Sequence, residues 1–239
     1  MSGPMVAESA AMVGAASVRG AAGDRTAKDG AAKDGAATRR LSIGVLALQG
    51  GVAPHLEALA RLDAAERDAG GGGIASRRVL IPADLDGLDG LILPGGESTA
   101  VGKLLAEGGL RDALRERIAG GMAAWGTCMG AILLAADIAN DGRRHLALMD
   151  MAVERNAYGS QLDSFRIPHE IDGAAGGPFP MVFIRAPVIR SVGESVRVLA
   201  RVDGAIVACA QGRLLATTFH PELSDDLRVH ALFAAMARS

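Results

Sequence analysis

The chain has 239 residues, of which 49% are hydrophobic but only 3% aromatic, so small aliphatic side chains must build its core. Its formal net charge of −2 gives no electrostatic signature of a nucleic-acid-binding protein, and no stretch reaches the ~20 uninterrupted apolar residues of a membrane-spanning helix. Two cysteines, Cys128 and Cys209, are too few for a disulfide framework, which favours a reducing, cytoplasmic location.

Residues 1–39 are predicted to be a disordered tail rich in alanine and glycine. They contain the tandem repeat AKDGAAKDGAA and lack the large apolar side chains that offset the entropy of ordering. A partner-binding arm is the alternative interpretation. The segment lacks the basic start of a secretory signal peptide, and its recurring acidic residues disfavour a transit peptide. Residues 40–239 are predicted to form one domain.

The first half of this domain alternates predicted strands and helices. The apolar run LSIGVLAL at 41–48 predicts a buried strand, and the leucine spacing of 52–69 predicts a helix. Further strands are predicted at 77–81, 88–93 and 122–127, and further helices at 98–121, with a break at Gly108–Gly109, and at 129–139. This order predicts an α/β fold of three layers, with a mostly parallel sheet and helices on both faces.

The second half of the domain is predicted to be rich in strands, partly antiparallel. Apolar stretches follow one another with little helix between them, as in MDMAVERNAYG, PMVFIRAPVI, SVRVLARVDG, AIVACAQG and RLLATTFH. The final segment, 224–239, is predicted to be a helix with Ser224 as its N-cap.

The stretch GTCMG at 126–130 lies between a predicted strand and a predicted helix. Gly-x-Cys-x-Gly at such a junction is the spacing of a nucleophile elbow, in which a strained central residue projects above the sheet. Gly126 and Gly130 would let the strand and the helix pack closely. The helix dipole would favour a thiolate on Cys128, and the backbone N–H of Met129 would point toward an oxyanion. The alternative is that Cys128, like Cys209 in the strand AIVACAQ, is a buried apolar residue.

A cysteine nucleophile requires a base and a group that orients the base. His220 ends an apolar strand and lies two residues before Glu222, so alternation along a strand would place both side chains on one face. A carboxylate beside an imidazole selects its tautomer and stabilises its charged form. The other histidines, His55, His145, His169 and His230, are interpreted as surface or core positions.

The stretch LILPGGEST at 91–99 supplies a third candidate part of the site. Two glycines after a strand allow a backbone N–H to face an oxyanion, and Glu97 and Ser98 could hold a polar substrate. The alternative is an ordinary turn into a helix, with Ser98 or Thr99 as the N-cap.

In combination, these motifs resemble the class I glutamine amidotransferases and, more narrowly, the PdxT/SNO family, the glutaminase subunits of pyridoxal 5′-phosphate synthase. The stretches that carry the resemblance are IGVLALQGGVAPHLEAL, LDGLILPGGEST, WGTCMGAILLA, LALMDMAVERNAYGSQLDSF, VFIRAPVI and LLATTFHPELSDDLRVHALF. They extend over nearly all of residues 43–236.

The resemblance implies hydrolysis of L-glutamine to glutamate and ammonia, with Cys128 as nucleophile, His220 as base and Glu222 as its orienting partner. Implied glutamine contacts are Gly96, Glu97, Ser98, Arg155, Ile184 and Arg185. The oxyanion is expected to bind the N–H groups of Gly96 and Met129, and Gln49 is expected near the oxyanion hole and the synthase contact.

The resemblance also implies a partner, a separate TIM-barrel synthase subunit that receives the ammonia and on which full activity depends. Pyridoxal phosphate would be the product of that complex, so neither a cofactor nor a metal is expected in this chain. Three features depart from the family pattern: the tail, the lengthened connection RDAGGGGIAS, and Met129 where alanine is usual. The proline that usually precedes the strand before Cys128 is also missing.

Three other functions remain open from the sequence. One is the glutaminase of another amidotransferase, such as that of histidine biosynthesis, which VERNAYG and FIRAP disfavour. Another is a catalytically silent scaffold subunit that keeps the fold, and the third is a cysteine hydrolase of non-glutamine amides.

Overall fold

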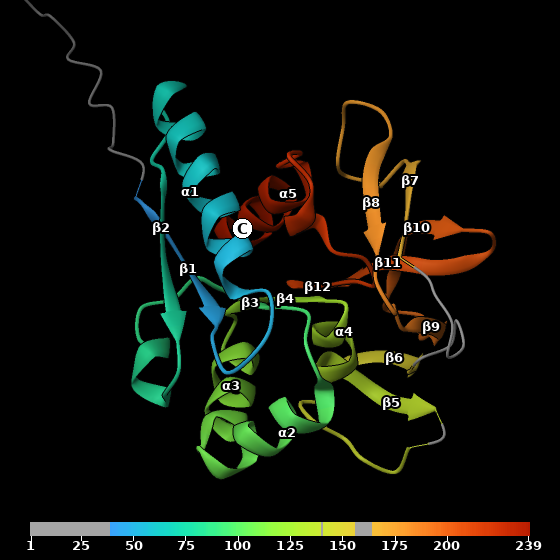
Figure 1. Ribbon diagram of the computed structural model, residues 1–239. Helices are drawn as coiled ribbons and strands as arrows, with labels where there is room; N and C mark the ends of the chain where they lie inside the picture. The colour runs from blue at the N-terminus through green and yellow to red at the C-terminus, as the bar shows by residue number, and fades with distance from the viewer. Residues whose placement is uncertain (1–38, 140, 156–163) are drawn as a thin grey trace, which may run out of the picture. The chain divides into compact units, whose positions relative to one another are not determined.

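A computed structural model describes residues 39–139, 141–155 and 164–239 (Figure 1). Apart from Arg39, the predicted tail over 1–39 lies outside the described residues. The described strands are β1 (Leu41–Leu46), β2 (Ile74–Val79), β3 (Gly90–Leu93), β4 (Ala123–Thr127), β5 (Ala135–Ala139), β6 (Met149–Glu154), β7 (Phe165–His169), β8 (Phe179–Phe183), β9 (Val188–Val192), β10 (Arg197–Val202), β11 (Ala205–Gln211) and β12 (Leu214–Thr217). The described α-helices are α1 (Val52–Asp68), α2 (Ser98–Glu107), α3 (Leu110–Ala119), α4 (Met129–Leu134) and α5 (Arg228–Arg238), with short 3₁₀ helices η1 (Pro82–Leu85) and η2 (Pro221–Leu223).

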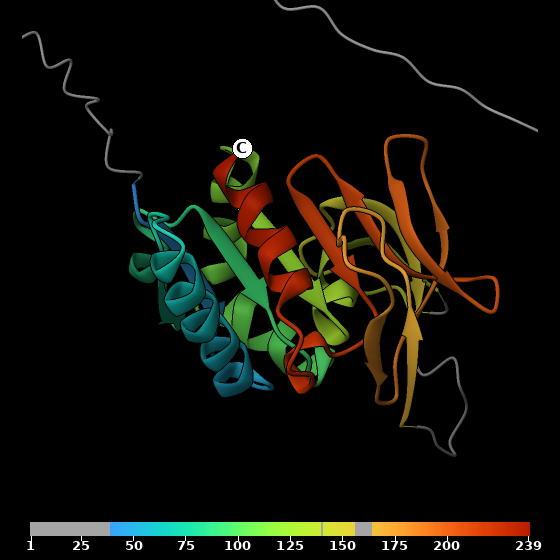
Figure 2. The same cartoon turned by 90° about the horizontal axis from the view of Figure 1, so that it is seen from above.

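The described strands build one large sheet in the order β2-β1-β3-β4-β12-β11-β9-β6-β5, with β10 paired to β11. From β2 to β12 the neighbouring strands run parallel. Helices α1 and α5 cover one face of this parallel part, and α2, α3 and α4 cover the other (Figures 1 and 2). Each face buries its own hydrophobic cluster, one aliphatic and the other containing Trp125 and four phenylalanines. The predicted three-layer α/β fold is confirmed.

The second half of the chain adds antiparallel strands, as predicted. Strand β11 pairs antiparallel with β12, β9 and β10, and β6 pairs antiparallel with β9. Strands β7 and β8 form a separate antiparallel pair, with Phe165 stacked on Phe183 at 4.6 Å between ring centroids. No helix in the described residues is long and apolar enough to cross a membrane.

Two local predictions about helices are wrong. The helix expected over 129–139 ends at Leu134, and Ala135–Ala139 forms β5, because β6 offers a parallel partner for its backbone. This pairing overrides the helix propensity of the alanines. Ser224 does not cap α5, since its hydroxyl donates to the carbonyl of Pro221. Asp226 instead accepts from the backbone N–H of Arg228, the first residue of α5.

Candidate active site

The C-terminal ends of the parallel strands border a cavity of about 510 Å³. Thirteen residues line it: Gln49, Gly95, Gly96, Glu97, Ser98, Cys128, Met129, Ile132, Arg155, Ile184, Arg185, Pro187 and His220. The structure thus brings together every candidate site residue from the sequence except Glu222, which lies behind His220. Sequence reasoning did not single out Ile132 or Pro187, and it included Gly95 only as one of the two glycines of LILPGGEST.

Cys128 occupies a sharp turn between β4 and α4. Its backbone angles are φ 48° and ψ −106°, which a residue with a side chain rarely adopts. A Cβ on Gly126 would overlap with the backbone of Gly130, and a Cβ on Gly130 would overlap with the carbonyl of Leu93. The close packing of strand and helix therefore requires both glycines, and the backbone has the geometry of a nucleophile elbow.

His220 and Glu222 pair directly, with 2.7 Å between His220 Nδ1 and Glu222 Oε1. The reason differs from the one expected, because β12 ends at Thr217 and Glu222 lies in the 3₁₀ helix η2. The turn at Pro221, rather than strand alternation, brings the two side chains together. The Glu222 side chain is only 1% exposed, and the His220 side chain 13%. Since Nδ1 faces Glu222, Nε2 is the ring nitrogen available to Cys128.

The electrostatics of this pair favour its charged form. Burial opposes the imidazolium, but hydrogen bonds to the side chains of Cys128 and Glu222, with their charges, raise the pKa of His220 to about 10. Burial likewise opposes the Glu222 carboxylate, but its hydrogen bond with His220 and the charges of His55 and His220 hold its pKa below the usual value. The charge that each partner carries is thus stabilised by the other.

The turn after β3 lies against both reactive side chains. A Cβ on Gly95 would lie 3.1 Å from His220 Nδ1 and 3.4 Å from Cβ of Cys128, and would overlap with Cε1 of the imidazole. The carbonyl of Gly95 accepts from the N–H of Gly51 at 3.0 Å. Gln49 Oε1 accepts from the backbone N–H of Glu97 at 3.2 Å, so Gln49 supports the backbone around Gly96.

Glu97 is the N-cap of α2, the role that the alternative interpretation gave to Ser98 or Thr99. Its carboxylate accepts from the backbone N–H of Thr99 at 3.0 Å and of Ala100 at 2.7 Å. The first of these bonds contributes most to lowering its pKa, against a smaller effect of burial. Ser98 is buried, and its hydroxyl has no hydrogen-bond partner among the described residues, although it borders the cavity.

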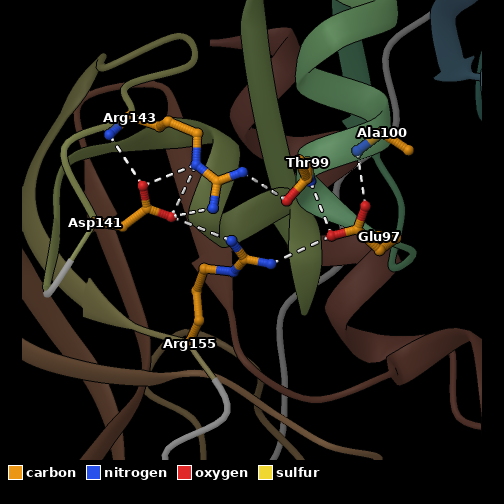
Figure 3. Close-up of polar contacts among 6 residues, drawn as sticks. All are labelled: Glu97, Thr99, Ala100, Asp141, Arg143 and Arg155. Atoms are coloured by element: carbon orange, nitrogen blue, oxygen red, sulfur yellow. Dashed lines mark hydrogen bonds and ion pairs between the residues drawn. The ribbon is translucent and has the colours of Figure 1, made fainter.

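Arg155 crosses from the end of β6 to Glu97 (Figure 3). Its guanidinium donates to Glu97 Oε1 and to Asp141 Oδ2, both at 3.2 Å. Asp141 also accepts several hydrogen bonds from Arg143, which hold its pKa well below the usual value. Arg143 reaches Thr99 Oγ1 at 3.0 Å. These contacts hold Arg155 at the cavity.

Sequence reasoning missed Asp141 and Arg143. They flank Gly142 in NDGR, which is an ordinary turn signal. Nothing in that signal indicates that the turn lies beside Arg155.

The loop after β8 closes the cavity beside the nucleophile. The thiol of Cys128 faces the carbonyl oxygen of Ile184, with 3.9 Å between sulfur and oxygen. Arg185 has a φ of 44°, in the left-handed region that non-glycine residues rarely occupy. Its side chain is exposed at the rim of the cavity.

Cys209, His55 and His230 are buried and do not line the cavity. Cys209 is fully buried in β11, where burial raises the pKa of its thiol to about 12. His55 and His230 are fully buried, on α1 and α5. Within 39–139, 141–155 and 164–239, no group of three or more histidine, cysteine or acidic side chains is placed to hold a metal ion.

Comparison with known families identifies the chain. Residues 45–239 match the SNO glutamine amidotransferase family. The chain belongs to this family. It is a glutamine amidotransferase, and the resemblance seen in its motifs is confirmed.

Named relatives of this SNO-family glutamine amidotransferase are subunits of one enzyme. The pyridoxal 5′-phosphate synthase subunit PdxT of Ruminiclostridium cellulolyticum is 46% identical over 194 residues, which are 81% of this chain and 98% of that protein. The subunit of the same name from Roseiflexus sp. is 49% identical over 200 residues, 82% of this chain and the whole of that protein.

Solved structures agree with the family. The crystal structure of a glutamine amidotransferase is 45% identical, with a TM-score of 0.74 over 82% of this chain and 99% of that chain. A glutamine amidotransferase from Thermotoga maritima, 10% identical, has a TM-score of 0.50 over 84% of this chain and 91% of that chain. This second structure shares the fold alone.

Proposed function

We propose that this glutamine amidotransferase is the glutaminase subunit of a pyridoxal 5′-phosphate synthase and that Cys128, His220 and Glu222 form its catalytic triad. One observation carries the proposal: Cys128, on a strained elbow, shares a cavity with His220, whose Nδ1 lies 2.7 Å from Glu222 Oε1. The family match and the names of the relatives support the substrate and the assembly.

In the proposed reaction, the thiolate of Cys128 attacks the side-chain amide carbon of glutamine. The carbonyl oxygen becomes an oxyanion that accepts from the N–H groups of Gly96 and Met129; loss of one such donor in another enzyme costs about 3 kcal/mol. His220 Nε2 gives its proton to the departing ammonia, which leaves a thioester on Cys128. His220 then takes a proton from water, whose oxygen attacks the thioester and releases glutamate.

The polar groups around the cavity suit the other end of the substrate. Arg155 presents a guanidinium, which binds a carboxylate well, and Glu97 presents an anion for the α-ammonium group of glutamine. The unpartnered hydroxyl of Ser98 and the exposed side chain of Arg185 complete the polar lining. We assign the backbone of Ile184 to substrate contact and Gln49 to support of the oxyanion loop.

The proposed partner is the synthase subunit that uses the ammonia. The relatives are named as subunits of pyridoxal 5′-phosphate synthase, which implies a second subunit for this chain as well. We expect that subunit to be a TIM barrel and to raise glutaminase activity when it docks. A cytoplasmic location suits the chain, because Cys128 and Cys209 are both free thiols.

The test is ammonia release from glutamine, with and without a pyridoxal 5′-phosphate synthase subunit. The full chain is compared with Cys128→Ala and, as a matched control, Cys209→Ala. We expect ammonia release that rises with the partner, disappears in Cys128→Ala and persists in Cys209→Ala.

Labelling with a glutamine-analogue electrophile separates the alternatives. Modification of Cys128 together with glutamine-dependent ammonia release supports the proposal. A chain that binds the synthase subunit but neither reacts with the analogue nor releases ammonia is a silent scaffold, and hydrolysis of other amides without response to the partner indicates a different hydrolase.

A further inference from the structure

Two buried histidines lie behind the proposed triad, on the side of Glu222 away from His220. His55 projects from α1 and His230 from α5, and both are 0% exposed. Neither has a role in the proposed reaction. Buried imidazoles are costly unless their polar atoms are paired, so their contacts require an explanation.

The contacts connect both rings to Glu222. His55 Nε2 lies 3.4 Å from Glu222 Oε2, the carboxylate oxygen that His220 does not use. His55 Nδ1 lies 3.1 Å from His230 Nε2. Trp125 packs edge-on against both rings, at 5.6 Å and 5.0 Å between centroids, and holds them in place.

One assignment of protons satisfies every N–H group in this series. If His55 carries its proton on Nε2, it donates to Thr127 Oγ1 at 3.3 Å and lies 3.4 Å from Glu222 Oε2, which has no hydrogen-bond partner among the described residues. His55 Nδ1 then accepts from Nε2–H of His230. His230 Nδ1, which has no partner among the described residues, is then a bare lone pair. The opposite assignment would bury an unpaired N–H on His230 and aim a lone pair of His55 at the carboxylate, which is far more costly.

The hydroxyl of Thr127 is compatible with the first assignment. It lies 3.3 Å from His55 Nε2 and can share the same proton. The resulting series of donors runs in one direction, from His230 through His55 to Glu222, and meets the bond from His220 on the other carboxylate oxygen.

We propose that His55 is a positioning residue for Glu222: as the Nε2–H tautomer selected by His230, it places a polar N–H group beside the second carboxylate oxygen and stabilises the anion that orients His220. The inference rests on the proposed function, since its effect on catalysis requires the triad. Neither ring can contact the substrate, because both rings are fully buried.

Titratable groups surround Glu222 on several of the elements packed against it. His220 precedes it in the chain, Cys128 lies at the β4–α4 turn, and α1 supplies His55 and, nearer to His230, Arg61. Burial lowers the pKa of His55 to about 4 and that of His230 well below its ordinary value. Both rings are therefore neutral near pH 7, as the assigned tautomers require.

Removal of the His55 donor should act on catalysis rather than on binding of substrate. Glu222 would keep its hydrogen bond with His220 but lose the polar N–H group beside Oε2, so it would protonate at higher pH and would orient His220 less well. In His55→Phe we expect kcat to fall about tenfold or more, with KM changed by less than about twofold and the acid limb of the kcat profile about one unit higher.

The experiment measures kcat, KM and the pH profile of ammonia release for the full chain with its synthase subunit. His55→Gln keeps an N–H donor and should retain most of the activity that His55→Phe loses. Leu59→Ala, a fully buried change on the same helix, is the matched control for a destabilised core. It should lower the melting temperature but leave the acid limb in place.

The inference is overturned if His55→Phe behaves like Leu59→Ala, or if His55→Gln is as impaired as His55→Phe. Nitrogen-15 NMR of the unmodified full chain provides a test that needs neither activity nor a folded variant. It should show the Nε2–H tautomer on both His55 and His230, and an Nδ1–H tautomer on His55 contradicts the proposal. A wild-type chain that releases no ammonia with its partner disproves the proposed function instead, and the tautomers still decide the inference.

Discussion

Gly95 and His220 are in contact across the proposed active site, although 125 residues separate them in the chain. A Cβ on Gly95 would overlap with Cε1 of the imidazole and would lie 3.4 Å from Cβ of Cys128. The absence of a side chain at position 95 thus allows the proposed base and nucleophile to approach each other.

Gly95→Ala should therefore displace His220 while the fold is kept. A shift of about 1 Å in a reacting group can cost about a hundredfold in rate, so we expect ammonia release to fall by about that factor. Gly142→Ala is the control, since a Cβ there meets nothing within 4 Å. Equal activity of the two variants would show that the ring adapts to the methyl group.

Glu222→Gln should lower the pKa of His220 from about 10 toward its ordinary 6.5, because the anion that stabilises the imidazolium is lost. Because the pKa of His220 is raised in the folded state, its protonation contributes its whole stabilising free energy below pH 6.5. This contribution is lost as the pH rises through 10. The wild-type advantage in free energy of unfolding should thus shrink from pH 6.5 to 10. NMR titration of His220 and denaturant unfolding measure both effects. An unchanged midpoint in the NMR titration of His220 would refute the assigned pairing. Glu107→Gln, an exposed change on α2, serves as the control.

Asp141→Asn should weaken the hold on Arg155 and so impair binding of glutamine. We expect KM to rise about threefold to tenfold and kcat to change by less than about twofold, because the nucleophile and base are untouched. Steady-state ammonia release measures both constants. Asp137→Asn removes an exposed carboxylate paired with Arg144 and should change neither. A fall in kcat at constant KM would contradict a role for Asp141 in binding.

Met129→Ala tests whether only the backbone of Met129 is needed. The side chain is 2% exposed, and its Cε lies against Gly96, where a Cβ would be 3.2 Å away. We expect the free energy of unfolding to fall by about 2 kcal/mol or more, with ammonia release within about threefold of wild type, because the N–H donor remains. A large loss of activity would show that the side chain positions Gly96.

Thr217→Val should leave a buried donor unpaired. Trp125 Nε1 donates to Thr217 Oγ1 at 3.1 Å, and both residues are at most 1% exposed. We expect the free energy of unfolding to fall by about 1–3 kcal/mol. Denaturant unfolding monitored by the fluorescence of Trp125, the single tryptophan, measures this loss. Thr218→Val is the matched control, because its buried hydroxyl has no partner among the described residues and its removal should cost little. Equal losses would argue against the Trp125 bond.

Much of the fold could be predicted because its determinants are local. The apolar run beginning at Leu41 predicts a strand, and the structure has β1 there. The break at Gly108–Gly109 separates two helices, and the glycines around Cys128 accompany the elbow. The prediction was wrong at Ala135–Ala139, where pairing with the next strand in the chain, β6, decides between helix and strand.

The candidate site also has residues that the sequence could identify and residues that it could not. No motif singled out Asp141: its turn signal is ordinary, and its contact with Arg155 depends on the pairing of β5 with β6. The resemblance did single out Cys128, His220 and Arg155, and the structure places all three at one cavity.

The sequence by itself determined the order of elements, the strained turn at Cys128 and the family, because these depend on periodicity, glycine spacing and short motifs. Only the tertiary structure decided that His55 and His230, 175 residues apart, meet behind Glu222. The physical reason is that a sequence pattern records which face of a helix is apolar. It does not record which helix lies opposite, and the pairing of buried polar atoms depends on that packing.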